Sequence, residues 1–283
     1  MRGLRDNRRM AAAPHRSRVL ASPWPGVHAT DIDSARHYGR HWHSTYAFGV
    51  IEHGAHRSAS GRGDVDAFAG DVVCTYPGEV HDGRPLGSPT RRWRNVYVEP
   101  ALFGSITDGG GDIAFKRAAF TDIRMHRAIT QLLAQLETWT NGDARVRASQ
   151  GLACEEALAR ACGLMLRGHS TAAPPRRDDA GVDLARVCQR LADAPADAPS
   201  LDELAALAGI GKFQLLRRFR KAYGTTPHDW LLQQRADRAR GLIRHGAGLS
   251  EAAAGSGFAD QSHMTRVFMQ RFGFTPGAWR DAH

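Results

Sequence analysis

Three histidines in the first hundred residues have the type and spacing that could hold a metal ion. His41 and His43 are separated by one residue on the edge of an expected strand, and His81 ends the segment Pro77-Gly-Glu-Val-His. Three imidazole groups can bind Zn, Fe or Mn and leave one coordination position open. Such a site would suit a metal-dependent enzyme.

Other catalytic patterns do not emerge from the sequence. It contains no Ser-His-Asp order, phosphate loop or paired carboxylates, and Gly61-Arg-Gly-Asp is typical of a turn. The four cysteines, at positions 74, 154, 162 and 188, form no Cys-x-x-Cys pair, which indicates reduced thiols in a cytoplasmic protein. We therefore expect no catalytic residues.

The charge balance favours a nucleic-acid partner. The 283 residues include 38 Lys and Arg against 29 Asp and Glu, a formal net charge of +9, and all but three of the 38 are arginine. The guanidinium fork matches phosphates and guanine edges, although a GC-rich genome would also raise the arginine content. No run of 18 apolar residues occurs, so a membrane partner is not expected.

Strands and helices occupy different parts of the front half. Three β-prone runs, Tyr46–Ile51, Asp71–Tyr76 and Trp93–Val98, are separated by glycine-containing turns. Short strands at about ten-residue spacing are typical of an all-β sandwich or barrel. Apolar residues then recur at helical spacing from Met125 to Trp139, and a second helix is expected over 144–167. These helices would pack on the β unit or on a second subunit.

A Pro-, Ser- and charge-rich stretch divides the chain. Residues 169–181 are expected to form a linker that lets the second half of the chain fold alone. The other predicted parts are a basic disordered arm over 1–18, a β-rich domain with two C-terminal helices over 19–168, and an all-helical domain over 182–283. A true start at Met10 would also explain the arginine-rich beginning.

The helical half contains an internal repeat with an offset of 49 residues. Five positions share this offset: Phe219/Phe268, Gly224/Gly273, Thr226/Thr275, Pro227/Pro276 and Trp230/Trp279. A short helix, a glycine-containing turn and a longer helix precede each copy, and Ser200 with Glu203 forms a capping box at the first short helix. Two such units in register predict a pair of helix-turn-helix motifs.

A helical wheel gives each longer helix an apolar face and an outward face. Arginine occupies the same outward position in both units, as Arg217 and Arg266, where it could read guanine. From Lys212 to Arg244 there are nine basic and two acidic residues, which is the footprint of phosphate binding. The predicted DNA contacts are Lys212, Phe213, Gln214, Leu216, Arg217, Arg220, Lys221, Gln261, Ser262, Thr265 and Arg266.

At these residues the chain resembles the AraC/XylS-type transcription regulators. Leu201–Gly209 looks like the first helix-turn-helix of that family, and Gly257–Arg280 looks like its signature segment. The resemblance covers about residues 182–280. It implies seven helices, with two recognition helices that enter successive major grooves and a strut helix from about 229 to 243 between them.

The chain departs from the family pattern just before each recognition helix. The family usually has serine there, whereas this chain has Gly211 and Ala259. Glycine caps a helix tolerably, while alanine caps it poorly, at a cost of about 1 kcal/mol. Gly255 should also weaken the scaffold helix of the second unit. We therefore expect the second unit to bind DNA less firmly than the first.

The front half resembles the cupin-like sensor domain of the same family over about residues 24–100. The resemblance lies in His41-Trp-His-Ser-Thr-Tyr46, Gly70-Asp71, Pro77–His81 and Val96–Pro100. It implies a barrel mouth that binds a small effector and flanking helices that form a dimer interface. The predicted pocket residues, which mix aromatic walls with polar groups, are His41, His43, Tyr46, His81, Trp93 and Tyr97.

A metal-dependent cupin enzyme with a helical targeting tail is the alternative interpretation. The cupin metal motif has a glutamate four or five residues after its second histidine, where this chain has Ala47 and Phe48, and Glu52 lies too far along. We therefore expect no tightly bound metal and no cofactor.

The resulting prediction is a multidomain α and β protein, with an N-terminal cupin-like β-barrel and flanking helices followed by a C-terminal all-α double helix-turn-helix domain. Its expected function is sequence-specific transcription regulation in response to a small-molecule effector, without enzymatic activity. The expected partners are double-stranded promoter DNA, the effector and a second copy in a homodimer, with RNA polymerase as a further candidate.

Overall fold

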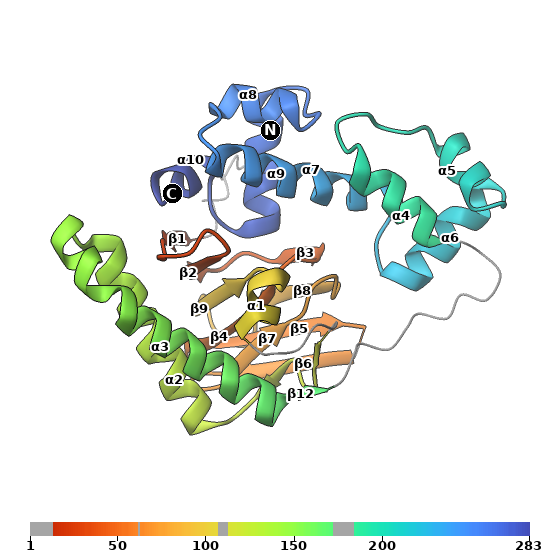
Figure 1. Cartoon of the computed structure of the whole chain (residues 1–283). Helices are drawn as coiled ribbons and strands as arrows, with labels where there is room; N and C mark the ends of the chain where they lie inside the picture. The colour runs from red at the N-terminus through yellow and green to blue at the C-terminus, as the bar shows by residue number, and fades with distance from the viewer. Residues whose placement is uncertain (1–13, 62, 107–112, 172–183) are drawn as a thin grey trace, which may run out of the picture.

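The alternating runs of the front half pair into antiparallel sheets, and the last hundred residues are helical (Figure 1). The computed structural model describes residues 14–61, 63–106, 113–171 and 184–283. One sheet has the order β1 (His15–Leu20), β2 (Val27–Ser34), β9 (Arg91–Val98), β4 (Tyr46–His53), β7 (Val72–Thr75) and β11 (Ala119–Phe120). The other has the order β3 (Tyr38–His41), β8 (His81–Pro85), β5 (Ala55–Ser60) and β6 (Gly63–Phe68). A small pair joins β10 (Ala114–Phe115) to β12 (Ser170–Thr171).

Three helices accompany the sheets, and α2 and α3 lie side by side against the six-stranded one (Figure 1). They are α1 (Pro100–Ile106), α2 (Ile123–Asn141) and α3 (Ala144–His169). Asp122 caps α2 by accepting hydrogen bonds from two backbone N–H groups of its first turn, and the helix ends before Gly142, as predicted. The apolar face of α2 is buried on the sheet.

The alternation along β4 assigns its side chains to two different environments. Tyr46, Phe48 and Val50 belong to the core shared with α2 and α3. Ala47 and Ile51 point the other way, into the space between the two sheets. This arrangement confirms the predicted fold class, and the strands form two facing sheets instead of one closed ring.

The prediction of a disordered arm over residues 1–18 is wrong for its last part. His15–Arg18 form the start of β1, which pairs with β2 from His15 opposite Ser34 to Leu20 opposite Ala29. Val19 and Leu20 are buried and anchor this strand to the core. Residues 1–13 lie outside the described part of the chain.

The predicted linker begins later than expected. The helix α3 continues through His169, and Ser170 and Thr171 form β12, so ordered structure extends three residues into the predicted segment. His169 stacks on Phe120 and its Nε2 lies 2.9 Å from Asp122 Oδ2, which anchors this end of α3. Residues 172–181 of the predicted linker lie outside the described residues.

The helical half contains the repeat as two helix-turn-helix units. Its helices are α4 (Leu184–Asp193), α5 (Leu201–Leu207), α6 (Lys212–Tyr223), α7 (Pro227–Arg244), α8 (Leu249–Gly255), α9 (Gln261–Phe272) and α10 (Pro276–Asp281). The units are α5–α6 and α8–α9, and α7 is the long helix between them.

The repeated Gly-x-Thr-Pro segment ends one helix and begins the next. Gly224 and Gly273 follow α6 and α9 in the left-handed conformation, with φ of 69° and 80°. Thr226 and Thr275 then cap α7 and α10, whose first residue is proline in both cases. The repeat is therefore a matched pair of helix stop and start signals.

The start of α9 differs from the prediction. Asp260, not Ala259, is the N-cap, and its side chain accepts a hydrogen bond of 2.6 Å from the backbone N–H of His263. Aspartate is among the best capping residues, so the expected cost at Ala259 does not arise. By contrast the N-cap of α6 is Gly211, which makes no side-chain cap hydrogen bond. A poor cap on α9 is therefore no longer a reason to expect weaker DNA binding by the second unit.

The two halves pack against each other through shared apolar clusters. Trp42 and Val80 of the β-rich half lie in one cluster with Trp230 of α7 and its neighbours, and Val19 of β1 lies in the cluster beneath α8, α9 and α10. An ion pair of 2.7 Å joins Arg244 to Glu99 across the same boundary. The helical half is thus docked on the sheets. The sequence had predicted only a linker between the two halves and no contact between them.

Candidate functional site

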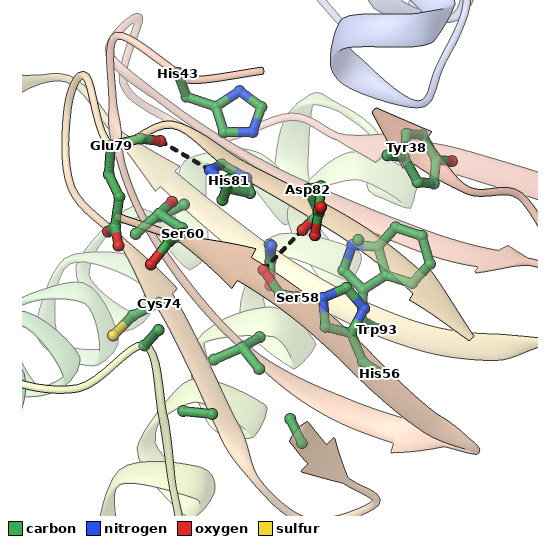
Figure 2. Close-up of a pocket in the computed structure, with 18 of the residues that line it drawn as sticks. Tyr38, His43, His56, Ser58, Ser60, Cys74, Glu79, His81, Asp82 and Trp93 are labelled. Atoms are coloured by element: carbon green, nitrogen blue, oxygen red, sulfur yellow. Dashed lines mark hydrogen bonds between the residues drawn. The ribbon is translucent and has the colours of Figure 1, made fainter. Parts of the chain in front are cut away.

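A cavity of about 100 Å³ lies between the two sheets (Figure 2). Its walls combine side chains from β9 of the larger sheet with side chains from β3, β5 and β8 of the smaller one. Sites for drug-sized ligands usually measure about 300–1,000 Å³. This cavity therefore has room for an ion or for a molecule of a few non-hydrogen atoms.

Five of the six predicted pocket residues line this cavity, namely His41, His43, His81, Trp93 and Tyr97. Tyr46 does not, and its assignment is corrected. It lies on the other face of β4, where its ring stacks on Phe103 with centroids 4.2 Å apart and its hydroxyl accepts a hydrogen bond from Ile113 N. The period of two along a strand places Tyr46 on the face opposite Ala47.

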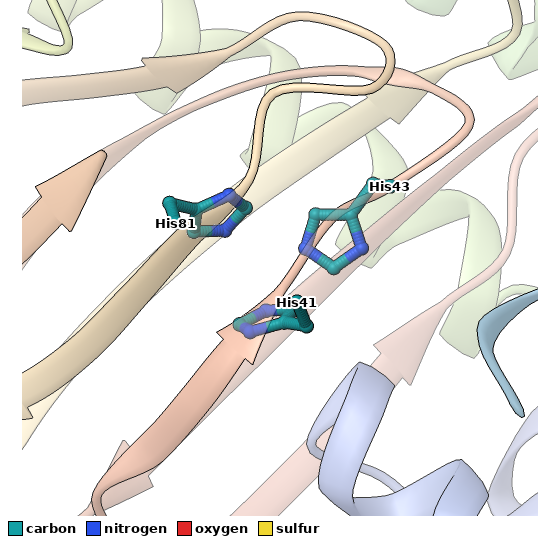
Figure 3. Close-up of side chains that lie close together, drawn as sticks. All are labelled: His41, His43 and His81. Carbon is teal, nitrogen blue, oxygen red and sulfur yellow. The ribbon is translucent and has the colours of Figure 1, made fainter. Parts of the chain in front are cut away.

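His41, His43 and His81 come together at one end of the cavity (Figure 3). The ring centroids of His41 and His81 are 4.5 Å apart, and His43 lies 5.0 Å from His41 and 5.2 Å from His81. One nitrogen from each ring lies within 4.8 Å of those of the other two. The sequence placed these residues near each other in the predicted barrel, and the pairing of β3 with β8 sets His41 directly opposite His81.

Backbone carbonyls orient two of these rings. His41 Nδ1 lies 2.8 Å from Gly39 O and His81 Nδ1 lies 2.9 Å from Glu79 O, and a carbonyl can only accept a hydrogen bond. In the neutral form of each ring Nδ1 therefore carries the proton, and Nε2 carries the lone pair that a metal ion would bind. Burial, and then the neighbouring imidazoles, lower the pKa values of His41 and His43 well below 6.5.

Sequence reasoning did not assign Arg91 and His56 to the cavity, although both line it. The guanidinium of Arg91 is fully buried, and its Nε donates a hydrogen bond of 2.7 Å to His56 Nδ1. Burial, followed by the charge of Arg91, lowers the pKa of His56 to about 3, so this ring is neutral. The alternation of Arg91 with Trp93 along β9 could have indicated the arginine, but nothing in the sequence placed it beside His56.

The helical half contributes the last wall of the cavity. Arg271 and Phe272, at the end of α9, line it together with the histidines. The ring centroid of Phe272 lies 6.5 Å from that of His43, with the two ring planes inclined by 27°. Arg271 donates a hydrogen bond of 3.2 Å to the backbone of Arg40 and pairs with Asp229 at 3.4 Å. Because these residues come from a distant segment, sequence reasoning could not place them here.

The predicted DNA-contacting residues lie on the longer helix of each unit. Arg217, Arg220, Lys221 and Leu216 are exposed on α6, and Gln261, Ser262 and Arg266 are exposed on α9, while Gln214 and Thr265 are half-buried. The side chains of Lys212 and Phe213 lie outside the described part. The inward residues Leu215, Phe219, Met264 and Phe268 are fully buried, as the helical wheels predicted.

A second hollow lies between α6, α9 and the start of β3. Arg220 of α6 and Arg266 with Gln270 of α9 face it, and Arg36 and Arg40 of the β-rich half form the opposite wall. These side chains give the hollow a concentration of basic groups, which suits a polyanion. The two longer helices therefore border one basic surface.

Two family models match the chain. Residues 27–161 match an AraC-like ligand binding domain, and residues 204–282 match a helix-turn-helix domain. The first covers most of the sheets with α2 and much of α3, and the second covers α6–α10 with most of α5. The first match includes most of the residues that line the cavity, and the second includes the longer helices α6 and α9.

Individual relatives and solved structures agree with these matches. The Bacillus subtilis protein YbfI, named an uncharacterized HTH-type transcriptional regulator, is 26% identical over 236 residues, which cover 80% of this chain and 81% of YbfI. RipA of Corynebacterium glutamicum, an HTH-type transcriptional regulator, is 37% identical over 93 residues, 33% of this chain and 28% of RipA. The fold is similar to that of ToxT from Vibrio cholerae, with a TM-score of 0.51 at 10% identity over 94% of this chain and 96% of ToxT.

Proposed function

The chain belongs to the AraC family of transcription regulators, and from this premise we propose that α6 and α9 bind promoter DNA under the control of the cavity between the sheets. The front half would sense a small ligand, and the helical half would transmit its presence to the promoter. The contact of α9 with the cavity supports this link, because Arg271 and Phe272 belong to both.

The repeated arginine position is the observation that carries the proposal. Arg217 and Arg266 stand at equivalent positions of two matched helices, and both are exposed. Arginine recognises guanine through two hydrogen bonds in the major groove, and each such contact contributes about 1–3 kcal/mol of discrimination. Nearby Arg220 and Lys221 are also exposed, and we assign them to phosphates.

The test compares specific and random DNA. We expect Arg217→Ala and Arg266→Ala each to weaken binding to the specific site by about 1–3 kcal/mol with little effect on random DNA. Lys221→Ala should weaken binding to both alike, because a phosphate contact carries no sequence information. Arg160→Ala removes an exposed charge on α3 and serves as the matched control. Equal losses on both DNAs for every variant would show that the base-reading face is misassigned.

The loss of the capping argument changes one expectation. Because Asp260 caps α9, the capping argument no longer makes Arg266→Ala milder than Arg217→Ala. We propose that both units contribute to recognition, and comparable losses for the two variants would support this. A loss confined to Arg217→Ala would leave α6 as the only base-reading helix.

We propose that the cavity is a sensor site and not a catalytic one. Its volume of about 100 Å³ suits a ligand much smaller than a typical drug-sized molecule. Binding of that ligand should change DNA affinity, and DNA should change ligand affinity by the same factor, typically about 5- to 150-fold. Trp93→Ala should remove the response and leave DNA binding without ligand nearly unchanged.

The remaining partners are also proposals. A homodimer formed through α2 and α3 would use helices that cover one side of the β-rich half (Figure 1). Light scattering of the purified chain would test the dimer.

RNA polymerase is a further candidate partner of a promoter-bound regulator in the cytoplasm. No helix in the described part of the chain is long and apolar enough to span a bilayer.

A further inference from the structure

We propose that His41, His43 and His81 form a binding site for one divalent transition-metal ion, and that its occupancy is a signal which this regulator transmits to its DNA-binding half. The signalling part rests on the proposed function, and the metal site itself does not. The proposal departs from the expectation that the missing glutamate would prevent tight metal binding, because three well-placed imidazoles suffice for a site with an open position.

The three rings already have the spacing of a ligand set. One nitrogen of each lies within 4.8 Å of the others, whereas nitrogens about 2.0–2.1 Å from a tetrahedral zinc ion are about 3.3–3.4 Å apart. Closing this difference of up to about 1.5 Å requires each of two rings to move by less than about 1 Å, which side-chain rotation can supply. His41 and His43 are 8% and 7% exposed, and the His81 ring is half-buried, so the ligands are shielded from bulk water.

The hydrogen bonds around the rings match those of metal-ligating histidines. In such sites the ring nitrogen that does not bind the metal donates to a carbonyl or carboxylate, which fixes the tautomer and the ring plane. Gly39 O and Glu79 O take this role for His41 and His81. His56 provides the contrast within the same cavity, because its Nδ1 accepts a hydrogen bond from a buried guanidinium. That ring is part of an arginine contact and not of the ligand set.

The chemistry of the ligands indicates the class of ion. Neutral imidazole suits Zn, Cu, Fe and Ni, whereas Mg²⁺ and Ca²⁺ prefer oxygen ligands. The three rings line the cavity, so a fourth position on the ion would face the cavity, where water or a small anion could complete the coordination.

The position of the site links it to the helical half on two sides. Trp42, between two of the proposed ligands, packs against Trp230 of α7 with ring centroids 4.7 Å apart and ring planes tilted by 36°. On the other side the ring centroid of Phe272 of α9 lies 6.5 Å from that of His43. An ion that draws His41 and His43 towards His81 would therefore act on the backbone that carries Trp42 and on the residue that ends α9.

The first experiment measures metal binding by the full chain without DNA. Protein stripped with a chelator is titrated with Zn²⁺ by calorimetry and with Co²⁺ by visible absorption, whose d–d bands report the coordination. We expect one ion per chain and a loss of affinity greater than about 100-fold in His41→Gln and in His81→Gln, because even second-sphere changes weaken metal sites by 10–100-fold. His56→Gln, a buried cavity histidine outside the set, should retain the ion.

Folding is checked for each variant by circular dichroism, and His43→Gln is a third, independent substitution in the set. Absence of stoichiometric Zn²⁺ and Co²⁺ binding by the folded wild-type chain would overturn the site. Unchanged affinity in folded His41→Gln and His81→Gln would overturn the ligand assignment as well.

The second experiment measures DNA affinity with Zn²⁺ and with the chelator. We expect the two affinities to differ by about 5- to 150-fold in the wild-type chain and to become equal in His41→Gln. A wild-type chain that binds the ion but shows the same DNA affinity in both conditions would overturn the signalling part alone. A chain that binds no DNA in either condition would refute the proposed function, while the metal titration would still decide the site.

Discussion

Removal of the Trp42 side chain is expected to loosen the DNA-binding half from the sheets. Trp42 is 7% exposed and packs on Trp230 of α7, so most of its ring is buried at the boundary between the halves. A tryptophan buries about 150–250 Å², which at about 25 cal/mol/Å² corresponds to about 4–6 kcal/mol. Val80 of the β-rich half belongs to the same cluster and would keep part of the contact in the variant. We therefore assign only about 3 kcal/mol of this burial energy to the docking of the two halves.

Urea unfolding of full-length Trp42→Ala, followed by circular dichroism and by tryptophan fluorescence, measures this loss. The shared clusters predict one cooperative transition for the wild-type chain and an earlier, separate transition of the helical half in the variant. With a denaturant slope of about 1–3 kcal/mol/M, a loss of 3 kcal/mol lowers the midpoint by about 1–3 M.

Trp139→Ala is the matched control, because Trp139 packs on the core between α2 and the sheet and belongs to neither of the two clusters that join the halves. It should destabilise the β-rich half without separating the two transitions. A Trp42→Ala chain that unfolds in one transition, with its midpoint within about 0.3 M of the wild type, would refute the docking described here.

Three further predictions follow from single side chains. Asp260→Ala should destabilise the helical half by about 1 kcal/mol through loss of the α9 cap, and Ala259→Ser should change stability little, as measured by thermal unfolding. Burial raises the pKa of the Cys162 thiol to about 12, so this thiol should react with a thiol reagent at pH 8 only after denaturation, and prompt labelling would contradict its burial. The pKa of His56 falls from 6.5 to about 3 on folding, so the unfolded chain binds more protons than the folded chain between these pH values. His56 therefore lowers the free energy of unfolding by about 1.4 kcal/mol for each unit that the pH drops in this range. His56→Gln should remove this contribution and flatten the slope in urea titrations at several pH values.

Local patterns predicted the helical half because its signals are short-range. The helix stops at Gly224 and Gly273 and the starts at Thr226 and Thr275 are backbone effects confined to a few residues. The same locality explains the error at the start of α9. A family pattern pointed to Ala259, whereas the hydrogen bond that caps the helix comes from the next residue.

The cavity was predictable only in part. Residues at alternate positions of one strand, such as Trp93 and Tyr97, could be assigned to one face, but which face of β4 borders the cavity depends on how the sheets pair, and Tyr46 was misplaced for that reason. Arg271 reaches the cavity from another half of the molecule. Such contacts depend on the docking of the halves, which no local pattern encodes.

Binding of the full-length chain to duplex DNA from upstream of its own gene tests the central claim most directly. Fluorescence anisotropy over a series of salt concentrations should show specific binding with a slope of log K against log salt near −5, as expected if about six phosphates are neutralised. The Arg217→Ala, Arg266→Ala double variant should lose the preference for this DNA over random sequence and keep most of the slope. A folded wild-type chain that shows no salt-dependent binding to this DNA would contradict the assignment of α6 and α9 as DNA-binding helices.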